Sequence, residues 1–128
     1  MPKYSSKSRY MLSEVHEDLQ ELFNEAIKYF DLTIIEGLRT KERQKELVAE
    51  GKSKTLQSKH ILGQAVDVAP YHDGIDWDNK DNFNYMGGFI MGLARQMGIP
   101  LRWGGDWNSN NDLSDNGFDD FVHFELDY

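Results

Sequence analysis

One carboxylate stands in the middle of the most apolar strand that this sequence predicts. Residues 64–69 read Gln-Ala-Val-Asp-Val-Ala, and Pro70 ends the run. Successive side chains of a strand point to opposite faces, so Val66 and Val68 enter the core while Asp67 points away from it. An aspartate is disfavoured in a strand, and burying it without a partner is costly. The fold must therefore supply Asp67 with a partner.

Two histidines are candidates for that role. His60 lies seven residues before Asp67, and His123 lies in a predicted C-terminal strand, residues 121–126. If the two strands are neighbours in one sheet, Asp67 and His123 share a face and His60 can fold over them. Two imidazoles and one carboxylate suit a catalytic zinc ion, which usually takes three protein ligands and a water. The donor types alone also permit iron or manganese.

A second aspartate, Asp120, stands three residues before His123. Zinc lowers the pKa of bound water to about 7, and a nearby carboxylate can then accept its proton. Each residue also has a plainer interpretation when taken alone. His60 could be a loop histidine, Asp67 half of an ion pair, and His123 a hydrogen-bonded core residue.

The rest of the chain predicts helices and strands in alternation. Apolar residues at helical spacing predict a first helix, and β-branched runs bounded by glycine or proline predict strands. The expected elements are a helix over 13–30 with Ser13 as its N-cap, a strand at 32–36, a helix over 41–50 capped by Thr40, a loop at 52–63, a helix over 82–97 and a strand at 100–103. This order predicts an α+β fold in one domain, residues 1–128, with a small, mostly antiparallel sheet and flanking helices.

Composition excludes several classes of protein. The chain has no cysteine, so disulfides and thiolate metal sites are absent. The net charge is −8, and residues 60–128 alone carry 3 basic and 12 acidic side chains, which argues against nucleic-acid binding. No apolar run is long enough to span a membrane, and the N-terminus lacks the apolar segment of a secretory signal. We therefore expect synthesis in the cytoplasm. The acidic half suits cation binding, but solvated acidic surface explains it equally well.

Two separated motifs carry a resemblance to a known family. Ser58-x-His60-x-x-Gly63-x-Ala65-x-Asp67 followed by Asp120-x-x-His123 resembles the paired signature of the LAS-type zinc peptidases. That group includes D-alanyl-D-alanine carboxypeptidases, the dipeptidases of vancomycin resistance and phage L-alanyl-D-glutamate endolysins, and the hedgehog signalling domain shares its fold. The resemblance implies zinc ligands at His60, Asp67 and His123 and a catalytic acid/base at Asp120. It also implies a hedgehog- or DD-peptidase-like sheet.

Within that group the chain is most similar to the phage enzymes. They resemble it in using aspartate at position 120, in size, and in the His-Phe-Glu-Leu sequence at 123–126. The resemblance implies a zinc endopeptidase that cuts the L-alanyl-D-glutamate bond of peptidoglycan stem peptides. We expect a monomer that starts in the host cytoplasm and acts on the cell wall after release. The alternatives are a D-alanyl-D-alanine carboxypeptidase, a non-catalytic hedgehog-like zinc module and a cell-wall-binding domain.

Three further side chains are candidates for the site. Arg39 follows the strand at 32–36 and resembles the family arginine that contacts substrate or the developing oxyanion; a guanidinium also suits the free carboxylate of D-glutamate. Ser58 could bind substrate as it does in relatives, and Glu125 could orient a ligand imidazole. The plainer alternatives are a surface or helix-end arginine, a loop serine and a simple ion pair.

A weaker signal predicts a calcium site. Oxygen-bearing side chains alternate through one loop, as they do at the start of an EF-hand. They are Asp106, Asn108, Asn110, Asp112, Ser114 and Asp115. Position six holds Asn111 instead of glycine and position twelve holds Gly117 instead of glutamate, so a true EF-hand is rejected. An improvised calcium site that orders the loop before Asp120 stays an expectation.

Overall fold

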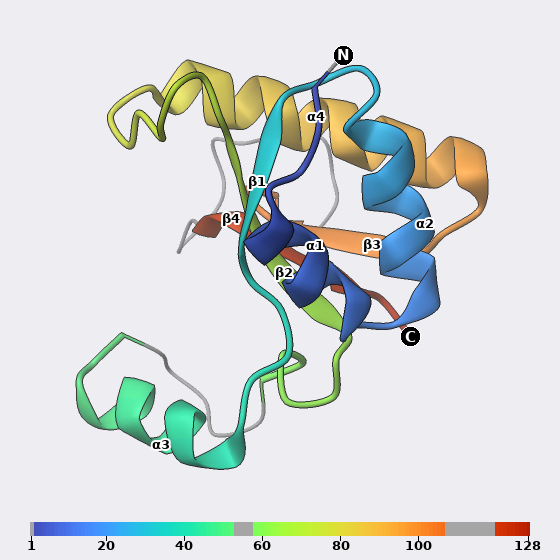
Figure 1. Cartoon of the computed structure of the whole chain (residues 1–128). Helices are drawn as coiled ribbons and strands as arrows, with labels where there is room; N and C mark the ends of the chain where they lie inside the picture. The colour runs from blue at the N-terminus through green and yellow to red at the C-terminus, as the bar shows by residue number, and fades with distance from the viewer. Residues whose placement is uncertain (1, 53–57, 107–119) are drawn as a thin grey trace.

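A four-stranded sheet forms the frame of the molecule (Figure 1). The computed structural model describes residues 2–52, 58–106 and 120–128. The strands pair in the order β1-β2-β4-β3, and every pairing is antiparallel. Their bounds are β1 Leu32–Glu36, β2 Ala65–Pro70, β3 Leu101–Gly104 and β4 Asp120–Leu126. The expected α+β class with an antiparallel sheet is confirmed.

Four helices accompany the sheet in the described part of the chain. They are α1 Ser6–Ser13, α2 Glu17–Ala26, α3 Lys41–Ala49 and α4 Lys80–Met97. Apolar side chains of α1, α2 and α4 join those of the sheet in one hydrophobic core. Val66, Val68 and Phe124 are fully buried in it. Burying a side chain of this size contributes about 1.5–3 kcal/mol, so these alternate positions fix which face of the sheet is left for Asp67 and His123.

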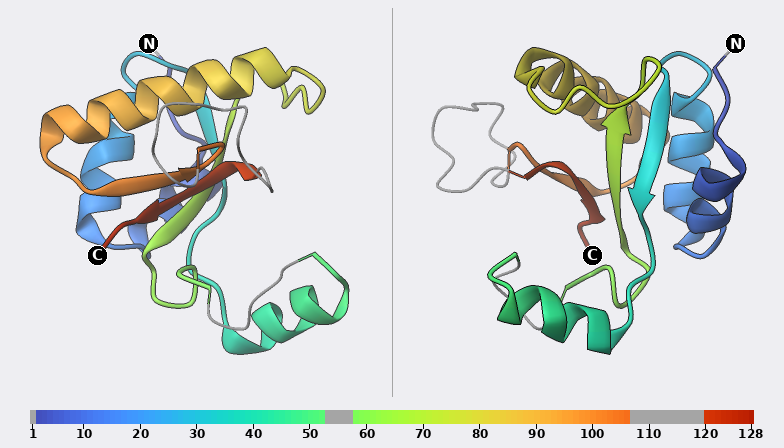
Figure 2. Two further views of the ribbon diagram at one scale, coloured as in Figure 1. Left: turned by 180° about the vertical axis from the view of Figure 1, so that it is seen from behind. Right: turned by 60° about the vertical axis from the view of Figure 1, so that its left-hand side comes forward.

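Helix α3 stands apart from the other three helices. Figures 1 and 2 show α4 along one end of the sheet and α3 beyond the opposite end, where β1 ends and β2 begins. Thr40 caps α3, because its hydroxyl accepts a hydrogen bond from the Arg43 amide at 3.1 Å. Most of α3 is exposed, but Gln44 is fully buried. Helix α3 buries one apolar side chain as well, Leu47, so a polar contact through the Gln44 amide helps to hold this helix.

The predicted helix over residues 13–30 is wrong. The chain forms two helices there, and Ser13 is the last residue of α1 instead of an N-cap. His16 caps α2, since its Nδ1 accepts a hydrogen bond from the Asp18 amide at 3.1 Å. The apolar stripe nevertheless continues through the break, because Leu12, Val15 and Leu19 are all buried. The helical spacing of apolar residues here predicts which side chains are buried, but it does not show that one continuous helix carries them.

Smaller differences concern the ends of elements. Helix α4 begins at Lys80, two residues before the predicted start, because the Asn79 side chain accepts a hydrogen bond from the Asn82 amide. It ends at Met97, and Gly98 follows as its C-cap with a φ of 74°, which suits glycine. Strand β4 begins at Asp120 instead of Phe121. Among the described residues no helix is both long and apolar enough to cross a membrane.

Trp103 fixes the start of β4 against α4. A Cβ atom at Gly87 of α4 would lie 2.1 Å from the Trp103 ring, and one at Gly105 would lie 2.3 Å from it, so only glycine allows this packing. The indole Nε1 donates a hydrogen bond to the Phe121 carbonyl at 2.9 Å. Trp103 thereby holds the backbone next to Asp120, on the same strand as His123.

Candidate metal centre

The pairing of β2 with β4 brings the first two predicted ligands together. Asp67 and His123 are direct partners in the antiparallel register. Side chains of directly opposite residues lie on the same face, with Cβ atoms roughly 4.5–5.5 Å apart. His123 Nδ1 lies 3.3 Å from Asp67 Oδ1. The sheet therefore provides two of the three candidate ligands without any contribution from a loop.

The third ligand arrives from the turn before β2. His60 lies 2% exposed in a turn that runs to Gly63, whose φ is 69°. Its Nε2 lies 3.2 Å from Asp67 Oδ1, and its Nδ1 lies 2.8 Å from the Gly37 carbonyl. A Cβ atom at Gly37 would approach the Met11 carbonyl to 2.8 Å, so glycine allows the chain to pass close to α1 at this point. The Gly37 carbonyl thus anchors the imidazole in one orientation.

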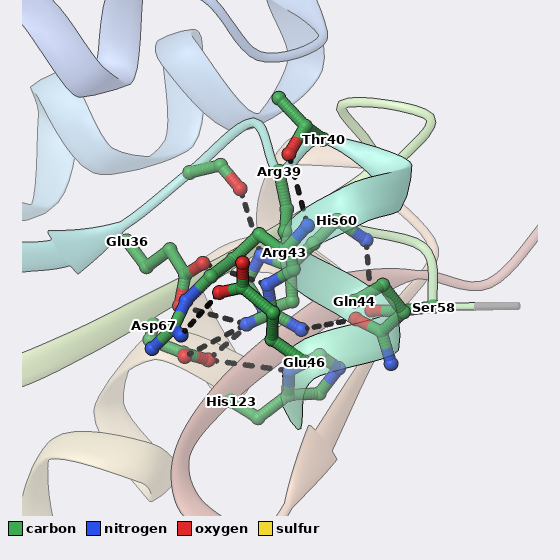
Figure 3. Close-up of polar contacts among 11 residues, drawn as sticks. Glu36, Arg39, Thr40, Arg43, Gln44, Glu46, Ser58, His60, Asp67 and His123 are labelled. Carbon is green, nitrogen blue, oxygen red and sulfur yellow. Dashed lines mark hydrogen bonds and ion pairs between the residues drawn. The ribbon is translucent and has the colours of Figure 1, made fainter. Parts of the chain in front are cut away.

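Arg39 is buried beside these ligands (Figure 3). Its Nε and Nη2 donate to the two carboxylate oxygens of Glu36 at 2.6 and 2.7 Å, and its Nη1 donates to Gln44 Oε1 at 2.7 Å. The Arg39 side chain is 8% exposed, and Nη2 lies 3.9 Å from Asp67 Oδ2. Bidentate pairing fixes both the position and the plane of a guanidinium. Glu36 and Gln44 together hold Arg39 at the edge of the site and attach α3 to it.

The electrostatics of Asp67 and His123 favour their charged forms. Burial raises the pKa of the Asp67 carboxyl, but hydrogen bonds with His123 and His60 outweigh burial and bring this pKa well below its ordinary value. Burial lowers the pKa of His123, but hydrogen bonds with Asp67 and Glu125 outweigh it and raise this pKa to about 9. The positive charge of a protonated His123 pairs with the negative charge of Asp67. A metal ion would take over this role and displace the proton.

Glu125 lies two residues beyond His123 on the same face of β4. Its Oε1 lies 2.9 Å from His123 Nε2, and its Oε2 lies 2.9 Å from Arg102 Nη2 and 3.6 Å from Lys59 Nζ. Burial raises the pKa of Glu125, but the hydrogen bond and charge of His123, with the charge of Arg102, lower it to about 2. Glu125 is therefore ionised at neutral pH.

Asp120 and Ser58 lie at the margin of the group. Burial and the negative charge of Asp67 raise the pKa of the Asp120 carboxyl, whereas His123, His60 and Arg39 act in the opposite direction. A Cβ atom at Gly104 would lie 2.1 Å from the Asp120 carbonyl, so close pairing with β3 sets where Asp120 begins its strand. The Ser58 hydroxyl accepts a hydrogen bond from the His60 amide at 3.2 Å. Ser58 thus shapes the turn that carries His60.

The three predicted ligands can hold one metal ion together. One ligand atom from each of His60, Asp67 and His123 lies within 4.8 Å of the others. Two ligand atoms at roughly 2.0–2.2 Å from one ion lie about 3.3–3.6 Å apart in a tetrahedral site. Asp67 Oδ1 lies at nearly this distance from both rings, 3.2 Å from His60 Nε2 and 3.3 Å from His123 Nδ1. The set of two imidazoles and one carboxylate is one that zinc takes in catalytic sites, where a water fills the fourth position. The structure thus brings together the residues that the sequence placed 63 positions apart.

Sequence reasoning missed the two residues that hold Arg39. Glu36 precedes Arg39 by three positions in an irregular connection, where no periodicity predicts which side chains meet. Gln44 lies on a helix whose other polar residues are mostly exposed, and nothing in its neighbourhood marks it as buried. Its burial depends on the position of α3 relative to the sheet, which only the tertiary structure supplies.

Two other candidates stand outside this centre. The predicted calcium loop falls outside the described residues except for Asp106, which is 7% exposed and whose amide donates to the Trp103 carbonyl at 3.0 Å. A cavity of about 350 Å³ lies between β2 and α4 and is lined by His72, Asp73 and Asn79, among others. None of the three metal-ligand candidates lines that cavity.

The sequence and the fold are similar to those of known peptidases. A family model described as phage L-alanyl-D-glutamate peptidase matches residues 1–127. The chain belongs to this family. It is 35% identical over 133 residues to the L-alanyl-D-glutamate peptidase of Escherichia phage T5, and the match covers 97% of each chain. The crystal structure of the L-Ala D-Glu endopeptidase ChiX of Serratia marcescens is similar at a TM-score of 0.80, with 33% identity, over 97% of this chain and 90% of that one.

A more distant solved structure shares the fold alone. The D,D-pentapeptidase VanY of a VanB-type resistance cassette, solved with Zn(II), is similar at a TM-score of 0.51, with 21% identity, over 90% of this chain and 70% of that one. The expected DD-peptidase-like fold is confirmed by this neighbour together with ChiX. Membership of the phage L-alanyl-D-glutamate peptidase family makes the protein a peptidase and excludes a purely structural zinc module.

Proposed function

We propose that this peptidase uses a zinc ion held by His60, Asp67 and His123 to hydrolyse the L-alanyl-D-glutamate bond of peptidoglycan stem peptides. The observation that carries the proposal is the meeting of three ligand atoms within 4.8 Å on one face of the sheet. The donor set fits zinc, and relatives named L-alanyl-D-glutamate peptidase supply the bond. Peptidoglycan is accordingly the substrate polymer and its stem peptide the binding partner.

A zinc ion held by His60, Asp67 and His123 would supply a positive charge that polarises the amide carbonyl and makes a water more acidic. The protein supplies the remaining groups. Asp120 accepts the proton from the attacking water and later passes it to the leaving amine, which is general acid–base catalysis. The partly buried position of Asp120 and its raised pKa suit such a group, because proton transfer in both directions is easiest when the pKa lies closer to the working pH.

Arg39 stabilises the negative charge that develops on the carbonyl oxygen or on a substrate carboxylate. Its three hydrogen bonds to Glu36 and Gln44 use three of the five N–H donors of a guanidinium. A donor that is already fixed in place costs no reorganisation during the reaction, which makes its electrostatic effect large. Ser58 lies next to His60 and is the proposed contact to the peptide backbone of the substrate.

Digestion of defined muropeptides tests the bond that is cut. We expect zinc-loaded protein to release L-alanine-terminated fragments from a stem peptide and to leave a terminal D-alanyl-D-alanine pair intact, as judged by mass spectrometry. Release of D-alanine instead would favour the D-alanyl-D-alanine carboxypeptidase. Absence of cleavage with both substrates by protein that holds one zinc per chain would overturn the proposal.

The biological setting follows from this activity. A phage enzyme of this class is made in the host cytoplasm and reaches the wall after release, and we propose the same route here as a monomer. A calcium site in the loop before Asp120 remains a separate proposal, tested by comparing hydrolysis rates with and without calcium at constant zinc. Equal rates would remove it without affecting the zinc centre.

A further inference from the structure

The two imidazoles of the candidate metal centre face Asp67 through different nitrogens. His60 presents Nε2, at 3.2 Å from Asp67 Oδ1, and His123 presents Nδ1, at 3.3 Å from the same oxygen. The other nitrogen of each ring is within hydrogen-bond distance of a different group. His60 Nδ1 lies against the Gly37 carbonyl, whereas His123 Nε2 lies against the Glu125 carboxylate. The two ligands are therefore held by groups of different charge.

We propose that Glu125 is a positioning residue that fixes the tautomer of His123 and thereby sets the zinc affinity of the peptidase. The inference rests on the proposed zinc function. An ionised carboxylate only accepts hydrogen bonds, so the ring nitrogen at 2.9 Å from Glu125 Oε1 carries the proton. In the neutral ring, the other nitrogen then has the lone pair, and it is Nδ1 that faces Asp67. Glu125 thus selects the metal-binding form of the ring.

The surroundings of Glu125 keep the carboxylate in this orientation. Its side chain is 9% exposed, and Oε2 lies 2.9 Å from Arg102 Nη2. Arg102 and Glu125 are direct partners in the β3–β4 register, so the sheet itself places the guanidinium beside the carboxylate. Lys59 Nζ lies 3.6 Å from Oε2 and also contacts the Leu126 carbonyl. One carboxylate oxygen is therefore occupied by cations while the other faces His123.

The same contacts link the two ligand segments of the chain. Lys59 directly precedes His60, and Glu125 follows His123 by two positions on β4. Their ion pair ties the turn that carries His60 to the strand that carries His123. A carboxylate also increases the basicity of the imidazole that donates to it, and loss of such a partner typically lowers metal affinity about 10–100-fold. The Gly37 carbonyl has no comparable charge and cannot replace it.

The test is the Glu125→Gln variant of the full chain. A glutamine amide keeps the shape of the side chain but can turn its NH2 toward His123 Nε2, which favours the wrong tautomer. We expect the zinc Kd, measured by competition with a chromophoric chelator, to rise about 10–100-fold. The matched control is Glu46→Gln, which removes the same charge from an exposed side chain on α3 that pairs with Arg43. It should leave the zinc Kd unchanged.

Long-range ¹H–¹⁵N spectra of the zinc-loaded wild type provide a readout that does not depend on any variant's folding. We expect His123 to carry its ring proton on Nε2 and His60 to carry its proton on Nδ1. A proton on Nδ1 of His123 would overturn the inference, as would an unchanged zinc Kd in a folded Glu125→Gln variant. Either result leaves the proposed function intact, whereas a wild type that binds no zinc defeats the proposed function itself.

Discussion

Asp67 and His123 stand directly opposite each other on β2 and β4, and His123 Nδ1 lies 3.3 Å from Asp67 Oδ1. The pairing register of the sheet thereby builds most of the candidate metal centre. A slip of one residue would turn one of these side chains toward the core and replace it with an apolar neighbour. The burial of Val66, Val68 and Phe124 opposes that slip. The packing that stabilises the core therefore also fixes the register that places Asp67 opposite His123.

Replacing Asp120 tests the proposed acid–base role. We expect Asp120→Ala to lower kcat by about 10²–10⁴-fold, because general acid–base catalysis contributes that much. Zinc content and the thermal melting temperature should stay at the wild-type values, since Asp120 is not one of the three ligands. Steady-state kinetics with a stem-peptide substrate, alongside metal analysis, provides the check. Wild-type turnover would contradict the role.

The Arg39→Lys variant tests the clamp made by Glu36 and Gln44. Lysine keeps the charge but cannot form the bidentate pair with Glu36. We expect kcat/KM to fall roughly 10²-fold, because displacement of a site group by about 1 Å has an effect of this size. Arg43→Lys is the matched control, since the Arg43 side chain is 47% exposed and pairs with Glu46 on the same helix. An equal fall of kcat/KM in both variants would show that the contacts of Arg39 with Glu36 and Gln44 do not matter for catalysis.

Zinc binding should stabilise the fold measurably. The ligands come from β2, β4 and the turn before β2, so a metal ion would connect segments that separate on unfolding. With free zinc at about 1,000 times its Kd, the free energy of unfolding should rise by about 4 kcal/mol. Thermal unfolding with zinc and with a chelator measures this difference. His123→Ala should reduce this difference strongly, and an identical zinc-dependent shift in that variant would place the metal elsewhere.

Alkaline pH should destabilise the protein through Tyr4. Its hydroxyl donates to the Phe23 carbonyl at 2.6 Å, and burial raises the pKa of the phenol well above its ordinary value. The unfolded chain releases this proton near pH 10 while the folded chain retains it. Stability is therefore complete below pH 10 and falls above it, by up to about 1.4 kcal/mol per pH unit.

Urea unfolding at pH 8, 10 and 11 would measure this effect. Tyr4→Phe should lose about 1 kcal/mol at pH 8, where the hydrogen bond is missing, and should show a smaller decline above pH 10. Tyr10→Phe is the control, because Tyr10 is 65% exposed. If Tyr4→Phe and the wild type decline equally between pH 10 and 11, Tyr4 is not the group responsible.

The parts of the fold that the sequence predicted are those with local signals. Alternation around Asp67 predicted β2, Thr40 predicted the start of α3, and glycine and proline after Met97 predicted the end of α4. The break between α1 and α2 was not predictable in the same way. Histidine is not among the preferred N-cap residues, and Leu12, Val15 and Leu19 keep helical spacing across the break.

The site residues also fall into those that the sequence predicts and those that only the tertiary structure shows. His60, Asp67, Asp120 and His123 were predictable because their spacing forms a motif and because a mid-strand carboxylate needs a partner. The contacts that orient them were not. Gln44 meets Arg39 only because α3 lies beyond the end of the sheet, and Arg102 meets Glu125 only through the β3–β4 register. Such contacts depend on tertiary distances that residue spacing does not encode.

X-ray absorption spectroscopy of the zinc-loaded protein tests the central claim most directly, because it reports the atoms around the metal itself. We predict a spectrum of two imidazole nitrogens and one or two oxygens at roughly 2.0–2.2 Å, with the two-imidazole signature reduced to one in either His60→Ala or His123→Ala. A zinc environment without imidazole, or one that both variants leave unchanged, would contradict the account.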